Sequence, residues 1–137
     1  MKIDGQCHCG FITYEAEISP DNVMMCHCTD CQTLSGSAFR TVALTQQGTF
    51  KLLSGELQIY VKTAESGARR PQSFCPRCGT PIFSTSEGDG PKVHSLRVGT
   101  IRQRNQLVPK PQLWCRSSQH WLGDLDHISM TETQPHF

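Results

Sequence analysis

Apolar and polar residues alternate along much of the chain, a period-two pattern that is typical of half-buried β-strands. In residues 11–18 the two faces of such a strand differ clearly, because one is polar and the other carries Ile12, Tyr14, Ala16 and Ile18. Residues 38–44 and 57–61 alternate in the same way, and apolar runs at 81–84, 93–98 and 107–115 complete the strand candidates. The pattern therefore predicts a mainly β protein.

Breaks in the alternation predict where these strands turn. Ser54-Gly55-Glu56 separates the apolar runs at residues 49–53 and 57–61, which predicts a β-hairpin. Residues 63–72 and 86–91 are polar and rich in glycine or proline, so they are expected to be loops.

Helical signals are short and few. Thr29 is expected to cap a helix over residues 30–35 that ends at Gly36. A second helical turn is expected near residues 119–122, and residues 131–137 have the composition of a frayed tail. The sequence therefore predicts one or two short helices beside the strands.

Length and composition fit one domain over residues 1–130, followed by the tail at 131–137. The chain has 137 residues, and its hydrophobic fraction is 36% with eight cysteines included, which leaves little ordinary core material. No apolar run is long enough for a membrane span, and no apolar leader follows Met1, so we expect a cytoplasmic protein without a membrane partner. The net charge of +1 and the absence of a basic stripe argue against a nucleic-acid partner.

The cysteines are the main chemical signal. Seven of the eight fall in three short clusters, which are Cys7-His8-Cys9, Cys26-His27-Cys28-Thr29-Asp30-Cys31 and Cys75-Pro76-Arg77-Cys78. Thiols that are one or two residues apart can converge on one ion, and soft thiolate ligands favour zinc, with an iron–sulfur cluster as the rival. Seven ligands divide naturally into a closed site of four and an open site of three. Spacing alone leaves the pairing of the clusters open.

Cys115 stands apart from these clusters in the run Leu113-Trp114-Cys115. Its apolar neighbours predict that it packs as a small hydrophobic residue. The alternative is that Cys115 supplies a fourth ligand to the second site.

Four motifs together resemble the glutathione-dependent formaldehyde-activating enzyme family, which also includes centromere protein V. They are Gly5-Gln6-Cys7-His8-Cys9-Gly10, the Cys26–Cys31 cluster, Gly36-Ser37-Ala38-Phe39, and residues 74–83 with Cys75-Pro76-Arg77-Cys78-Gly79 at their centre. The resemblance covers residues 3–123 and implies an Mss4-like fold of antiparallel β-sheets around a zinc site. It also implies two zinc ions per chain, a structural ion on Cys7, Cys9, Cys75 and Cys78 and a second, open ion on Cys26, Cys28 and Cys31.

The resemblance further implies a carbon–sulfur lyase activity of the S-hydroxymethylglutathione synthase type. Such an enzyme adds the thiol of glutathione to a small aldehyde such as formaldehyde, or cleaves the adduct, and the three cysteines of the open site would be its catalytic ligands. The alternatives are a non-catalytic zinc-binding interaction module and a zinc-dependent thiol-transfer enzyme that acts on something other than formaldehyde. One departure from the family pattern is Gln112, which stands where a histidine is usual.

Several polar residues near the clusters are candidates for orienting a substrate. His27 and Ser37 are candidates that could equally be a loop histidine and a turn cap, and Arg40 is interpreted mainly as a solvated charge on its strand. His8 is expected to be exposed and not a ligand, and the pair Arg69-Arg70 is interpreted as a loop charge without a partner.

Overall fold

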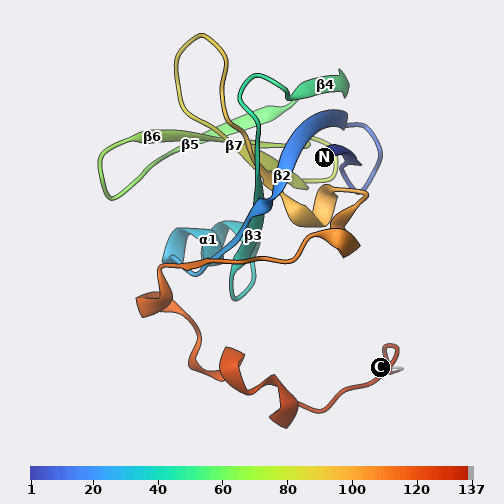
Figure 1. Cartoon of the computed structure of the whole chain (residues 1–137), viewed down its shortest axis with the longest axis vertical. Coiled ribbons are helices and arrows are strands. Elements are labelled where there is room, and N and C mark those ends of the chain that lie inside the picture. Colours follow the sequence, from blue (N-terminus) through green and yellow to red (C-terminus); the bar gives the residue numbers. More distant parts are fainter. Residues whose placement is uncertain (136–137) are drawn as a thin grey trace.

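The computed structural model of the chain describes residues 1–135 and contains one nine-stranded, mostly antiparallel sheet with a single short α-helix (Figure 1). The central path of the sheet runs β1-β2-β3-β8-β7-β6-β5, and β4 and β9 both pair with β2. The strands are β1 (Lys2–Gln6), β2 (Thr13–Cys26), β3 (Arg40–Thr45), β4 (Lys51–Ser54), β5 (Gln58–Thr63), β6 (Arg69–Phe74), β7 (Pro81–Ser84), β8 (Ser95–Arg97) and β9 (Gln112–Leu113). The helical elements are α1 (Thr29–Ser35) and the 3-10 turns η1 (Val98–Thr100), η2 (Arg104–Gln106), η3 (Cys115–Ser117) and η4 (His120–His127). The mainly β prediction is confirmed.

The long strand β2 organises the sheet because its two halves pair with different neighbours. Its first half pairs with β1 and β4, and its second half pairs with β3 and β9. The register shifts between Ile18 and Val23, where Pro20 cannot donate a ladder hydrogen bond. The strand predicted over residues 11–18 is therefore correct but too short, since the chain resumes the same strand after the bulge.

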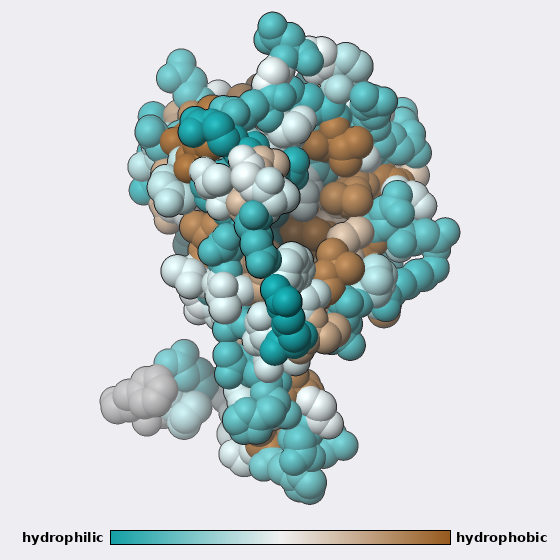
Figure 2. Space-filling model, turned by 90° about the vertical axis from the view of Figure 1, so that its left-hand side faces the viewer, coloured by the Kyte–Doolittle hydropathy of each residue, from teal (hydrophilic) through white to brown (hydrophobic). Residues whose placement is uncertain are grey.

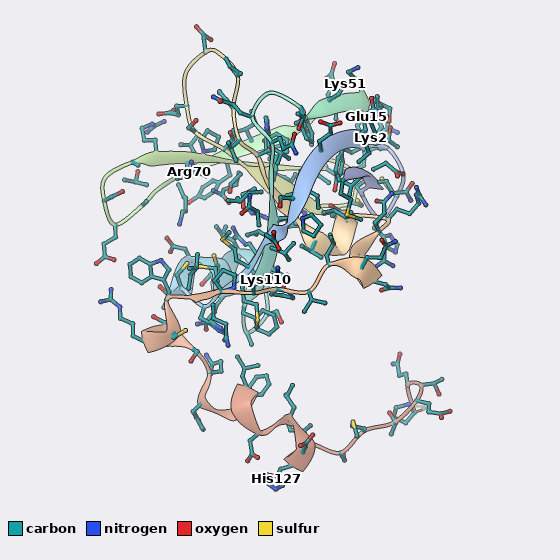
Figure 3. All side chains as sticks on the ribbon, in the orientation of Figure 1. Lys2, Glu15, Lys51, Arg70, Lys110 and His127 are labelled. Carbon is teal, nitrogen blue, oxygen red and sulfur yellow. The ribbon has the colours of Figure 1, made fainter. Side chains whose placement is uncertain are left out.

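The core lies under the face that the alternation in residues 11–18 predicts. Tyr14 and Ile12 are fully buried, and the Tyr14 hydroxyl bonds to the hydroxyl of Thr100 at 2.7 Å. Gly5 faces Tyr14 across the β1–β2 ladder, and a Cβ there would lie 2.4 Å from the Thr100 carbonyl oxygen. On the outer side of these strands, Glu15 pairs with Lys51 of β4, and Figure 3 shows the two side chains close to Lys2.

The predicted hairpin over residues 49–61 is wrong. β4 pairs with β2, and β5 pairs instead with β6. Residues 64–68 therefore form the hairpin turn, and the other half of the predicted loop at 63–72 is strand. Gly55 has a φ of 85°, and its backbone packs directly against Phe11 and Ile12. The turn therefore contacts the core, and β4 does not fold back onto β5.

The predicted helix is present, but its cap is one residue earlier than expected. Cys28, and not Thr29, is the N-cap of α1, because its sulfur accepts the Cys31 N–H. Gly36 ends the helix with a φ of 65°, as predicted.

After residue 107 the chain leaves the sheet except for the two residues of β9, so the apolar run at 107–115 is mostly not strand. The helical turn expected near residues 119–122 lies within η4, and Figure 1 shows the segment running below and away from the sheet. Residues 131–135 are exposed, and the last two residues of the predicted tail lie outside the described residues. Across residues 1–135, no helix combines the length and the hydropathy that a membrane span requires.

Candidate metal centres and an adjoining pocket

The first group of cysteines joins two turns from distant parts of the chain. Cys7 and Cys9 follow β1, whereas Cys75 and Cys78 follow β6, and all four Sγ atoms lie within 4.8 Å of one another. The Cys7–Cys9 and Cys9–Cys75 sulfur separations are 3.6 and 3.8 Å. Sulfurs around a tetrahedral zinc with bonds of about 2.3 Å are separated by about 3.8 Å, so the spacing fits a zinc ion. No disulfide competes, since all eight cysteines are free.

The turn over Cys75–Gly79 places two sulfurs where they can reach one ion. Gly79 has a φ of 80° and donates its N–H to the Cys75 carbonyl at 2.9 Å, which closes the turn. The Arg77 N–H points to the Cys75 sulfur at 3.4 Å. The hydroxyl and backbone N–H of Thr80 lower the pKa of the Cys78 thiol to about 5, which favours the thiolate that a metal requires.

The second group comes from one continuous segment. Cys26 ends β2, Cys28 caps α1 and Cys31 lies in its first turn, and their three Sγ atoms lie within 4.8 Å of one another. The Cys31 N–H donates to the Cys28 sulfur at 3.2 Å. Burial raises the pKa of the Cys31 thiol, and the nearby Arg40 guanidinium partly offsets that rise. A cation at the centre of the three sulfurs would favour their ionised form, so this group also fits a metal.

Cys115 does not complete the second group. Its side chain is exposed, and its sulfur contacts the Gln112 carbonyl oxygen at 3.6 Å. The prediction that Cys115 packs as a buried apolar residue is therefore wrong, because the chain turns outward at Trp114, which has a left-handed φ of 57°. Neither cysteine group found in residues 1–135 includes it.

His27 is held in place by Gln112. The ring is 1% exposed, and its Nε2 lies 2.8 Å from the Gln112 Oε1, so Nε2 carries the proton and Nδ1 is a buried nitrogen without a partner among residues 1–135. β9 places Gln112 there by pairing with the end of β2. Gln32 of α1 donates from Nε2 to the carbonyls of His27 and Ser117, which ties the C-terminal segment to the cysteine loop.

A pocket of about 420 Å³ lies between the two cysteine groups, since its lining includes Arg40, whose charge acts on Cys31, and Gly79, which follows Cys78. Figure 2 views the molecule from the side of α1 and the tip of the β5–β6 hairpin, and it shows apolar side chains gathered around a hollow. We call this cavity the arginine pocket; its lining includes Leu34, Arg40, Tyr60, Gln72, Phe74 and Arg97. Arg40 is only 9% exposed, so its interpretation as a solvated charge is wrong.

The other polar candidates lie outside both groups. Ser37 and His8 are exposed, as expected for a turn residue and a non-ligand histidine. Arg69 has a partner after all, since its Nε donates to Glu87 at 3.0 Å from within β6. The sequence patterns did not identify Gln72 and Arg97 as site residues, because neither lies in a cysteine motif.

These features define an antiparallel β protein with two cysteine groups that can each bind a metal ion. Residues 2–117 match the family model described as glutathione-dependent formaldehyde-activating enzyme, and the chain belongs to that family. At family level its function is the glutathione-dependent activation of formaldehyde, and the fold agrees with the Mss4-like architecture. Among solved structures, the chain is similar to a protein from Rhodobacter sphaeroides known from a crystal structure. That match has a TM-score of 0.60 at 19% identity, covers 80% of this chain and 98% of the other, and shows the fold alone.

Proposed function

We propose that this protein is a zinc-dependent carbon–sulfur lyase that joins the thiol of glutathione to formaldehyde or a similar small aldehyde, and cleaves the same adduct in reverse. The observation that carries the proposal is the group of three sulfurs from Cys26, Cys28 and Cys31, which includes no fourth cysteine. Arg40, which is directly opposite Cys26 in the sheet, lines the arginine pocket and so connects this pocket to the group. A metal site with three protein ligands keeps one position for a substrate, whereas a structural site is closed.

The proposed metal assignment gives each cysteine group one zinc ion. Cys7, Cys9, Cys75 and Cys78 would hold a structural ion with four sulfurs. The three cysteines of the second group would hold an open ion and are the proposed catalytic ligands. When bound there, zinc supplies a lowered thiol pKa and therefore a thiolate nucleophile at neutral pH.

The residues around the second group would orient the reactants. The reaction forms a bond between the glutathione sulfur and the carbonyl carbon, the electron pair of the C=O bond moves to the oxygen, and that oxygen takes the proton that the thiol loses. Gln112 and Gln32 fix the loop that carries the cysteines, and the arginine pocket offers a binding volume beside them. Holding the thiol and the aldehyde together would convert a bimolecular encounter into a reaction within one site.

Metal analysis and exchange spectroscopy test the proposal. Elemental analysis should find about two zinc ions per chain, and NMR exchange between free glutathione and its hydroxymethyl adduct should be faster with the protein than without it. Cys28→Ser should abolish the acceleration, whereas Cys115→Ser, outside both groups, should retain it. One ion per chain, or iron, would contradict the metal assignment. An exchange rate unchanged by the zinc-loaded protein would instead favour an interaction module.

A further inference from the structure

The arginine pocket contains two buried guanidinium groups and no acidic side chain. Arg40 and Arg97 are 9% and 8% exposed, and no aspartate or glutamate lines the cavity. None of the ion pairs formed within residues 1–135 includes either arginine. Buried charges are costly unless they are paired, so two unpaired cations in one cavity indicate a missing anion.

Strand register explains how the arginines come to lie beside the second cysteine group. Cys26 of β2 is directly opposite Arg40 of β3, and Val42, two residues further on, is opposite Arg97 of β8. Directly opposed residues and residues two apart share one face of a sheet. Cys26, Arg40 and Arg97 therefore lie on the same face, and Leu34, one helical turn after Cys31, also lines the pocket.

The hydrogen bonds of the two guanidinium groups leave donors free for a ligand. Arg40 makes one long bond, from Nη1 to the Gln72 Oε1 at 3.5 Å. Arg97 donates from Nη2 to the same oxygen at 2.8 Å and from Nη1 to the carbonyl and hydroxyl oxygens of Ser95 at 3.0 and 3.5 Å. Its buried Nε has no partner among the described residues. Each guanidinium has five N–H donors, so more than half of the ten are available.

Gln72 bridges the two guanidinium groups through one oxygen and does not neutralise them. Its Nε2 donates to the Arg70 carbonyl at 2.9 Å, which turns Oε1 toward both arginines. Burial, and then the neighbouring charge of Arg40, lower the pKa of Arg97 to about 9, so the group remains charged at neutral pH. Arg70, labelled on the hairpin side in Figure 3, adds to the same positive field.

The cysteine group does not balance this charge by itself. Three thiolates with one zinc ion carry a single negative charge, and the two buried guanidinium groups carry two positive charges. One positive charge is left over, next to free N–H donors and apolar walls. A planar carboxylate fits such a site, because it accepts paired N–H bonds from a guanidinium.

The geometry points to Arg40 and Arg97 as a binding site for a carboxylate of the thiol substrate, with Gln72 as the residue that positions them. The thiol itself is given by the family, and the new element is that these two arginines hold its carboxylate, so a thiol without a carboxylate is expected to bind more weakly. This inference rests on the proposed function, since it assigns a role to the cavity beside the same three cysteines.

Binding of an unreactive analogue tests the site without relying on turnover. S-methylglutathione has no free thiol, and its diamide has the same shape but no carboxylate. Titration calorimetry on the zinc-loaded protein should show the diamide binding about 10- to 100-fold more weakly than S-methylglutathione, as expected for the loss of charge-assisted hydrogen bonds. Inorganic phosphate should displace S-methylglutathione only at much higher concentration.

Two variants and a control test whether the arginines cause the preference for S-methylglutathione over its diamide. Arg40→Gln should reduce the affinity for S-methylglutathione by about 10-fold or more and leave the affinity for the diamide unchanged. Arg97→Lys keeps the charge but loses the forked geometry, so it should show a smaller loss in the same direction. Arg102→Gln removes an exposed arginine that pairs with Asp4 and should behave like the wild type.

The outcomes separate this inference from the proposed function. Equal binding of S-methylglutathione and its diamide, or of phosphate and S-methylglutathione, would overturn the carboxylate site even if formaldehyde exchange is accelerated. An Arg40→Gln variant that is folded by circular dichroism and retains the full preference would do the same. If the preference is present but exchange is not accelerated, the site stands and the lyase activity is rejected.

Discussion

The two cysteine groups use the same side chain in opposite ways. The first group joins residues that are 66 positions apart, such as Cys9 and Cys75, and so ties the turn after β1 to the turn after β6. The second group gathers three sulfurs from the six residues between Cys26 and Cys31. A long-range link restricts the unfolded chain strongly, whereas a short segment can bind an ion even when the rest of the chain is unfolded.

The residues around the two cysteine groups also differ. Cys9 and Cys78 of the first group are exposed, and their immediate neighbours are the backbone and hydroxyl groups that shape the turns. The second group lies opposite the buried charge of Arg40 and beside a histidine that Gln112 holds in place. Under the proposed metal assignment, the first site serves stability and the second serves chemistry.

The largest loss of stability should follow from breaking the first cysteine group, which joins distant parts of the chain. Cys75→Ser removes a fully buried sulfur of the proposed structural site. A structural zinc site contributes about 10 kcal/mol or more, which is comparable to the whole stability of a domain at about 5–15 kcal/mol. We expect the variant to be largely unfolded by circular dichroism and to bind about one zinc ion fewer. A cooperative melting transition near that of the wild type would show that the first group is not structural.

The next effect should come from the packing that presents the first group. Gly5→Ala places a Cβ 2.4 Å from both the Thr100 carbonyl oxygen and the Tyr14 hydroxyl, so the strand that leads into Cys7 must move. Overpacking of this kind destabilises by about 1–3 kcal/mol, which urea denaturation can measure. Gly123→Ala is the matched control, because a Cβ there meets no atom within 4 Å.

Breaking the second cysteine group should change stability less than breaking the first group does, and should change activity more. In Cys28→Ser the serine oxygen can still accept the Cys31 N–H, since serine is a preferred N-cap, so the helix keeps its start. We expect the free energy of unfolding to change by about 1 kcal/mol or less, together with loss of one zinc ion and of the exchange activity. Unfolding as extensive as that of Cys75→Ser would remove the distinction between the two groups.

The smallest effect should come from Cys115→Ser. The thiol is exposed and lies outside both groups, so zinc content, melting temperature and activity should all match the wild type. Loss of one zinc ion would place Cys115 in the second site and close it, which would weaken the case for an open metal.

Local patterns predicted much of the fold. The alternation in residues 11–18 identified the buried face that carries Ile12 and Tyr14, and Gly36 marked the end of α1. Strand partners were less predictable, since β4 pairs with β2 and not with the strand that follows it in the chain. A hairpin is the shortest connection, but the packing of Gly55 against Phe11 and Ile12 favours a different partner.

The sequence by itself determined which residues can bind a metal, because a cysteine motif brings its sulfurs together through a few backbone angles. Spacing left open which distant motif joins which, and the tertiary structure brings Cys7 and Cys9 to Cys75 and Cys78. Tertiary structure also decided that Cys115 points outward and that Arg40 and Arg97 meet in one buried pocket. An alternating strand reveals only that two side chains share a face. Whether an arginine on that face lies in solvent or in a cavity depends on the strands and the helix that pack beside it, and those contacts come from residues far away in the chain.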